Sequence, residues 1–293
     1  MDPDYIKLKE IKPVLGNYLR ESQILLNRSP VPDDEVIHDI RVYMKKARAV
    51  LKLIAPQLDR EYIHIDIAEL REIGRKMCLW RETSVMRKTL KQLKKEFPDL
   101  FSRLSDDEKI TSILTRPESV AEPADSISTD VELINSLLRK TGFRIRFLST
   151  NRLDPNLLLR ELEQTYARVT NTYLICRNNP RPDKIHDFRK SAKDFLYQLY
   201  FFRPLNPSSI KSLENKLDKL TRSLGRFNDL TQLVTALDYV YSPDRNLPVT
   251  DELVIRIREK QDRYLSEIWP LAYKIFCPGK KLVNILGFKL LVI

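Results

Sequence analysis

The sequence predicts an all-α protein built from two pseudo-symmetric bundles of four helices each. Only 6 of its 293 residues are glycine, which leaves few positions for the tight turns that connect short strands. Leucine, lysine, arginine and glutamate are abundant, and these residues favour helices. Two motifs also recur in the same order in the two halves of the chain, which is typical of an internal duplication.

Helix starts are expected, in chain order, near Lys7, Asp34, Tyr62, Leu79, Asp154, Asp183, Ser208 and Asp251. The third and fourth helices are either separate or one continuous helix. A proline and an aspartate introduce the second and the sixth helix, in Pro32-Asp33-Asp34 and Pro182-Asp183, and this combination marks a helix start. Pro56 and Pro204 are expected to end the same two helices, because proline does not fit a helix interior.

The first repeated motif is VIHDIRVYMKKARAVLKLI, which returns as KIHDFRKSAKDFLYQLYFF. An offset of 148 residues aligns three pairs, namely His38 with His186, Arg41 with Arg189, and Lys45 with Lys193. The second motif, IGRKMCLWRETSV, returns as KLTRSLGRFNDLTQL. There an offset of 147 aligns Arg75 with Arg222, Trp80 with Phe227, and Glu82 with Asp229. Two motifs in one order at nearly one offset indicate a duplication.

Charge divides the chain into two basic parts and an acidic connector. The net charge is +11, yet residues 105–135 carry eight acids and two bases. This segment also holds Pro117 and Pro123 and lacks a sustained apolar face at its centre. We therefore expect residues 1–135, including the connector 105–135, to form the first half and residues 136–293 the second half of one domain.

Cysteine usage and the termini favour a cytoplasmic protein without a cofactor. Cys78, Cys176 and Cys277 are far apart, a pattern that indicates neither a disulfide framework nor a zinc site. The N-terminus lacks the pattern of a secretory signal. The apolar tail from Leu282 to Ile293 is too short to span a bilayer, so we expect a packed helix or an extended tail, and no membrane partner.

The first repeated motif contains His38-Asp39 and its copy contains His186-Asp187, so we call the two copies the HD motifs. The first HD motif forms a basic stripe when it is drawn as a helix. At 100° per residue, a sector about 80° wide holds four bases, Arg41, Lys45, Arg48 and Lys52. An apolar face lies directly beside it, whereas Lys46 falls away from the stripe. The second motif repeats the stripe with Arg189, Lys193 and Lys190. There Leu196 aligns with Arg48, and Tyr197 and Tyr200 extend the stripe with hydroxyl groups.

Like charges on successive helical turns destabilise a helix by a few tenths of a kcal/mol per pair, so each stripe needs a compensating anion. Two sources remain open. Internal acids can pair with the bases across helices, and the candidates are Asp39, Glu82, Asp187 and Asp229. Alternatively, an external polyanion binds. His38 and His186 begin the two stripes, where a helix N-terminus already favours anions and neighbouring cations should disfavour histidine protonation.

The strings HDIRVYMKKARAVLKLI, HDFRKSAKDFLY and LGRFNDL resemble the signature of the CHAD family, the conserved histidine α-helical domain, over almost the whole chain. The resemblance implies two helical bundles around a basic central cleft that binds inorganic polyphosphate. It points to His38, Arg41, Lys45, Lys46, Arg48, His186, Arg189, Lys190 and Lys193, and the second motif pair adds Arg75, Arg81, Arg222 and Arg226. The chain departs from the family pattern at Leu196-Tyr197 and at Arg81-Glu82.

The motifs favour binding over catalysis. Relatives of the family occur with triphosphate tunnel enzymes that use an ExExK motif, but the nearest string here is Glu161-Leu162-Glu163-Gln164-Thr165, which lacks the lysine. We also find no phosphate loop, HExxH helix or GxSxG elbow. We expect a non-catalytic binder of polyphosphate or other phosphate-rich anions, with polyphosphate granules as a candidate location. The alternatives are an enzyme or enzyme accessory in polyphosphate metabolism, and a nucleic-acid-binding helical protein, for which no recognition motif is present.

Overall fold

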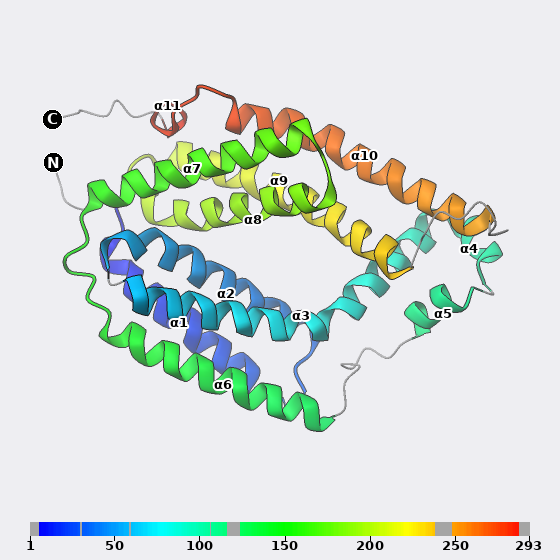
Figure 1. Ribbon diagram of the computed structural model, residues 1–293, viewed down its shortest axis with the longest axis horizontal. Coiled ribbons are helices and arrows are strands. Elements are labelled where there is room, and N and C mark those ends of the chain that lie inside the picture. The colour runs from blue at the N-terminus through cyan, green and yellow to red at the C-terminus, as the bar shows by residue number, and fades with distance from the viewer. Residues whose placement is uncertain are drawn as a thin grey trace.

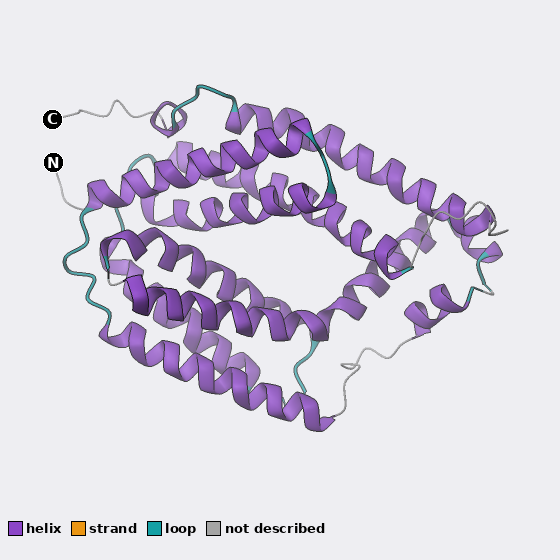
Figure 2. Ribbon diagram, viewed as in Figure 1, coloured by secondary structure: helices purple, strands orange, loops and turns teal. Residues whose placement is uncertain are grey.

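The computed structural model describes residues 6–29, 31–58, 60–105, 107–115, 124–237 and 248–286. Over these residues the chain consists of helices joined by short loops (Figure 1). None of the described segments is a β-strand (Figure 2). The predicted all-α class is therefore confirmed.

The long helices of the first part of the chain are α1 (Leu8–Leu26), α2 (Asp34–Ile54), α3 (Arg60–Glu96) and α6 (Ala124–Phe147), with the short helices α4 (Pro98–Arg103) and α5 (Glu108–Thr115) between α3 and α6. The remaining helices are α7 (Pro155–Asn178), α8 (Pro182–Leu199), α9 (Pro207–Ala236), α10 (Pro248–Phe276) and α11 (Leu282–Leu286). The expected third and fourth helices are one continuous helix, α3.

The HD motifs lie on α2 and α8, which we call the HD helices. Both helices begin and end close to the expected prolines. At the start of α2, the Asp33 carboxylate accepts a hydrogen bond of 2.8 Å from the Val36 N–H, so Asp33 is the capping residue. Helix α8 instead begins at Pro182, and its N-cap residue makes no side-chain capping bond. Each helix is followed by a short 3₁₀ turn, Ala55–Gln57 after α2 and Tyr200–Phe202 after α8.

The long helices form two groups that meet along α2 and α8. Helices α1, α2, α3 and α6 pack together, as do α7, α8, α9 and α10 (Figure 1). Contacts of α2 with α8 and of α3 with α9 join the groups. Helix α6 crosses the expected boundary between residues 135 and 136 and packs on α1 and α3. The acidic segment 105–135 thus contains α5 and the first part of α6.

The seam between α2 and α8 combines apolar packing with polar contacts. Met44 and Ala47 of α2 belong to the same buried cluster as Phe188 and Phe195 of α8. The buried Gln198 side chain donates a hydrogen bond of 2.9 Å to the carbonyl of Ala49. Because a buried N–H group without an acceptor is costly, this bond favours one register of α8 on α2. The two HD motifs are thereby held next to each other.

The C-terminal part of the chain contributes to the core. Leu282 and Leu286 of α11 are buried in the main cluster, as expected for a packed terminal helix, and the rest of the predicted tail lies outside the described residues. A second cluster lies where the far ends of α3, α9 and α10 meet. None of the helices in the described ranges is long and apolar enough to cross a membrane.

Candidate functional site

Arg41 of α2 and Arg189 of α8 are each anchored by a hydrogen bond to a main-chain carbonyl. Arg41 donates a hydrogen bond from Nη1 to the carbonyl of Gly74 on α3. Arg189 donates from Nε to the carbonyl of Thr221 on α9, at 3.4 Å. Gly74 and Thr221 are 147 residues apart, the offset of the second motif pair. Each HD helix therefore uses its arginine to reach an equivalent carbonyl on the next long helix.

Lys45 lies among arginines from three helices. Burial, followed by the charges of Arg41, Arg189, Arg81 and Arg48, lowers its pKa to about 7. Desolvation and nearby like charge both lower the pKa of a lysine, and here they act together. We call Arg41, Lys45, Arg48, Arg81 and Arg189 the basic cluster. It joins α2, α3 and α8, which positions three stripe bases from α2 beside bases that are distant in the sequence.

Asp229 is an acid inside the basic cluster. Burial raises its pKa, and the charges of Arg189, Arg81 and Lys45 oppose this shift. The carboxylate is thus shared by bases from three helices. Asp229 fits the internal source of compensating charge that the sequence left open. Glu82, the equivalent acid of the first half, lies outside the described side chains.

Two further acids approach the basic cluster at its edges. Asp34 raises the pKa of Arg81, opposing the larger effect of burial, but Asp34 also pairs with Lys88. Asp194 acts in the same way on Arg48 and pairs with Lys52 at 2.5 Å. Each of these carboxylates interacts with a cluster arginine and also pairs with another base. Internal acids therefore balance the positive charge of the basic cluster only in part.

Several N–H groups of the site lack a partner. The Nε atoms of Arg41, Arg48 and Arg81 are buried and have no hydrogen-bond acceptor within the described part of the chain. A buried donor without an acceptor costs about 1–3 kcal/mol. An arrangement of unpaired donors and excess positive charge favours a ligand that is rich in anionic oxygen atoms.

Both histidines at equivalent positions of the repeat, His38 and His186, have lowered pKa values. For His38, burial is the main cause and the charge of Arg81 is the next. For His186, burial is again first, followed by Lys190 and Arg189, while a hydrogen bond with Asn228 opposes the shift. The neighbouring cations act in the expected direction, yet burial has the larger effect. At neutral pH the imidazoles are therefore uncharged.

The family model of the CHAD domain matches residues 20–238. The chain belongs to the CHAD domain family. The crystal structure of the CHAD domain from the plant Ricinus communis is similar, with a TM-score of 0.56 and 17% sequence identity, over 99% of this chain and 94% of that chain. At this low sequence identity, the structural similarity supports a shared fold and nothing more. No curated protein matches the chain.

Three other predicted binding residues of this CHAD domain lie outside the basic cluster. Lys193 is 3.5 Å from Asp218, and its Nζ lies 5.6 Å from the ring centre of Tyr197. Lys190 is exposed and pairs with Asp187 at 2.9 Å. Lys46 points away from the stripe, as the helical projection predicts, and contacts the aromatic rings of α1 and α2.

The arginines of the second motif pair differ in their placement. Arg81 belongs to the basic cluster, whereas Arg75 is exposed and pairs with Glu72 at 2.6 Å. Arg222 is exposed and pairs with Asp218, and Arg226 is exposed on α9. Because α3 and α9 are each long and continuous, residues a few positions apart in a motif point to different sides of the helix.

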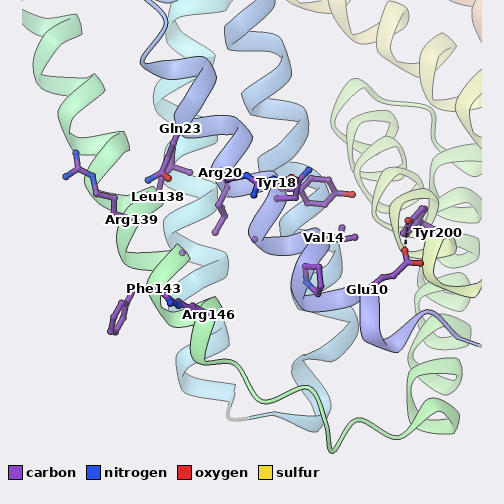
Figure 3. Close-up of a pocket in the computed structure, with 15 residues that line it drawn as sticks. Glu10, Val14, Tyr18, Arg20, Gln23, Leu138, Arg139, Phe143, Arg146 and Tyr200 are labelled. Atoms are coloured by element: carbon purple, nitrogen blue, oxygen red, sulfur yellow. Dashed lines mark hydrogen bonds between the residues drawn. The ribbon is translucent and has the colours of Figure 1, made fainter. Parts of the chain in front are cut away.

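A separate hollow lies across α1, between α6 and Tyr200 (Figure 3). Its volume is about 1250 Å³, and its lining includes Arg20 and Arg139 but no residue of the basic cluster. Tyr200 donates a hydrogen bond of 2.6 Å to Glu10 at one end (Figure 3). The hollow is therefore not part of the predicted binding site.

Proposed function

We propose that this CHAD domain binds inorganic polyphosphate through the basic cluster, in a cleft between the two helical groups, without catalysing a reaction on it. The observation that carries the proposal is the convergence of Arg41, Lys45, Arg48, Arg81 and Arg189, with a lysine whose pKa is lowered to about 7. Membership of the CHAD family, which spans both halves of the repeat, supports the same ligand.

The chemistry of the cluster suits a phosphate chain. Arginine can donate two parallel hydrogen bonds to phosphate oxygens, and lysine acts as a mobile point charge. Arg41 and Arg189 are each held by one N–H on a helix carbonyl, so other N–H groups of each guanidinium can serve a ligand. His38 and His186 are neutral donors, and each lies at the beginning of its stripe. Bases from several helices allow one chain to be contacted at successive phosphate groups.

A competition titration tests the ligand class. Purified protein should bind long-chain polyphosphate at physiological salt more tightly than ATP, pyrophosphate or single-stranded DNA. Arg41→Ala should weaken this binding by about tenfold or more, whereas Arg75→Ala, a matched loss of an exposed and paired arginine, should change it little. Comparable affinity for DNA at matched charge would favour a nucleic-acid binder.

Catalysis is tested with the same protein. Incubation with polyphosphate and a divalent cation should release no phosphate beyond a protein-free control. A phosphohydrolase needs a nucleophile, or carboxylates that organise metal, and the cluster offers mainly cations. Metal-dependent phosphate release that is lost in Arg41→Ala would instead make the cluster a substrate clamp of an enzyme.

A further inference from the structure

One face of α9 carries three residues, on successive turns, that act on the Arg189 side chain. Thr221, Gly225 and Asp229 are spaced four residues apart, so they lie on the same side of the helix. The Thr221 carbonyl accepts a hydrogen bond from Arg189 Nε at 3.4 Å. Asp229 is the strongest source of favourable charge for this guanidinium, and it opposes the effect of burial on the arginine's pKa.

Gly225 lets the guanidinium approach the helix closely. A Cβ atom at this position would lie 3.2 Å from Arg189 Nη2, 3.3 Å from Nε and 3.6 Å from Cζ. The first two distances are shorter than ordinary contacts between heavy atoms, which lie near 3.5–4.0 Å. Glycine inside a helix is less stable than alanine, so a buried glycine in the middle of α9 calls for a packing reason.

The first half of the repeat provides a comparison. By the offset of 147, Gly74, Cys78 and Glu82 align with Thr221, Gly225 and Asp229. Arg41 uses the Gly74 carbonyl as Arg189 uses that of Thr221. A residue with a side chain, Cys78, stands where the second half has glycine, so the close approach over a glycine is particular to Arg189.

We propose that Thr221, Gly225 and Asp229 form a cradle that holds the Arg189 guanidinium in position to bind a phosphate group, with Gly225 as a positioning residue. The binding role in this statement rests on the proposed function, whereas the cradle itself rests on the Thr221 hydrogen bond, the close approach over Gly225 and the charge of Asp229. The carbonyl fixes Nε, the carboxylate balances the charge, and the missing Cβ gives the guanidinium its space. A preorganised arginine loses less freedom when the ligand binds.

Gly225→Ala tests the positioning role in the full-length protein. Its affinity for long-chain polyphosphate should fall by about threefold to tenfold, less than the tenfold or more expected for Arg189→Ala. Its melting temperature should not fall, since alanine favours the helix. A purely structural role of the glycine predicts the reverse, a lower melting temperature with unchanged polyphosphate affinity. Gly16→Ala on α1 is the control, because no atom lies within 4 Å of a Cβ there, and it should leave binding unchanged.

A double-mutant cycle separates the cradle from the ligand. Gly225→Ala should raise the melting temperature more in an Arg189→Ala background than in wild type, because the displaced guanidinium is then absent. It should also cause no further loss of polyphosphate binding in that background. Equal changes in melting temperature in the two backgrounds would overturn the cradle, whether or not polyphosphate binds.

The binding outcomes are distinguishable from one another. If wild type binds polyphosphate and Gly225→Ala binds equally well, the positioning role is overturned while the proposed function stands. If wild type does not bind polyphosphate, the proposed function fails, and the melting temperatures of the four proteins alone decide whether Gly225 holds Arg189.

Discussion

Lys45 should set the pH dependence of polyphosphate binding. Its pKa of about 7 in the free protein follows from burial and from four arginines. A polyanion in the cluster adds negative charge, which favours the ammonium form and raises this pKa towards the ordinary value for lysine. Binding should therefore take up a proton at Lys45.

The sign and size of the effect follow from linkage. The bound form has the higher pKa, so affinity rises as the pH falls through about 7 and levels off below it. For a bound pKa well above 8, one linked proton amounts to about a tenfold gain in affinity from pH 8 to pH 6.

The other groups that face Lys45 do not account for a tenfold change in affinity between pH 8 and pH 6. Arg41 and Arg48 on α2, Arg81 on α3 and Arg189 on α8 stay charged there. His38, which shares α2 with Lys45, has a pKa below its usual value of about 6.5 because of burial and Arg81, so in the free protein it is neutral over most of this range. A bound polyanion favours its protonation as well, and the variants of Lys45 separate that contribution. The Asp229 carboxyl of α9 has a raised pKa, and the variants of Lys45 separate its effect.

Fluorescence anisotropy with labelled polyphosphate between pH 6 and pH 8 measures the effect in three proteins. Lys45→Arg keeps the charge at every pH, so its binding should be tight and nearly independent of pH. Lys45→Gln should bind weakly, also with little dependence on pH. Calorimetry of wild type in buffers of different ionisation enthalpy should show proton uptake. A flat wild-type profile, or a Lys45→Arg protein that keeps the wild-type slope, would refute the reasoning.

Three further predictions concern salt and single residues. If all five cluster bases contact phosphates, log K should fall with log salt with a slope of about 3.5, at about 0.7 per contact; a nearly flat response in anisotropy titrations would contradict the electrostatic site. Asp229→Ala should lower the free energy of unfolding by about 1–3 kcal/mol, since cluster bases lose their shared acid; a wild-type urea transition together with tighter polyphosphate binding would show Asp229 to be a repulsive group. Lys46→Ala should weaken binding less than Arg41→Ala in the same titration, because Lys46 contacts tyrosine rings outside the cluster; equal losses would place Lys46 on the ligand.

The HD helices were predictable because their signals are local. Asp33 and Pro182 mark the starts of α2 and α8 within one residue of the expected positions, and helical periodicity separated Arg41 and Lys45 from Lys46. These features depend on neighbours within one or two turns, which a single sequence displays. The acidic charge of residues 105–135 was less informative, because α6 begins among polar residues and is defined by packing on α1 and α3.

The membership of the basic cluster was only partly predictable. Arg75 and Arg81 occur in one motif, yet Arg75 pairs with Glu72 on the surface and Arg81 lies beside Asp34 and Arg41. Six residues along a helix correspond to a rotation of about 600°, so the two side chains point to different sides. Which side faces α2 is fixed by the packing of the continuous helix α3, a property of the whole fold.

The pKa of Lys45 shows why a charged stripe on one helix does not by itself define a site. On α2 alone, Arg41 and Arg48 would raise the cost of charging Lys45 only slightly, because exposed charges are well screened. Arg81 from α3 and Arg189 from α8 approach the same ammonium in the folded protein, and burial weakens the screening. In the free protein the bases of the cluster therefore repel one another, and a bound anion would relieve this repulsion. Folding thus places the basic cluster in an arrangement that favours an anionic ligand. Arg41 and Arg189 are tied to equivalent carbonyls of α3 and α9, so each arginine is held in place within its own half of this arrangement.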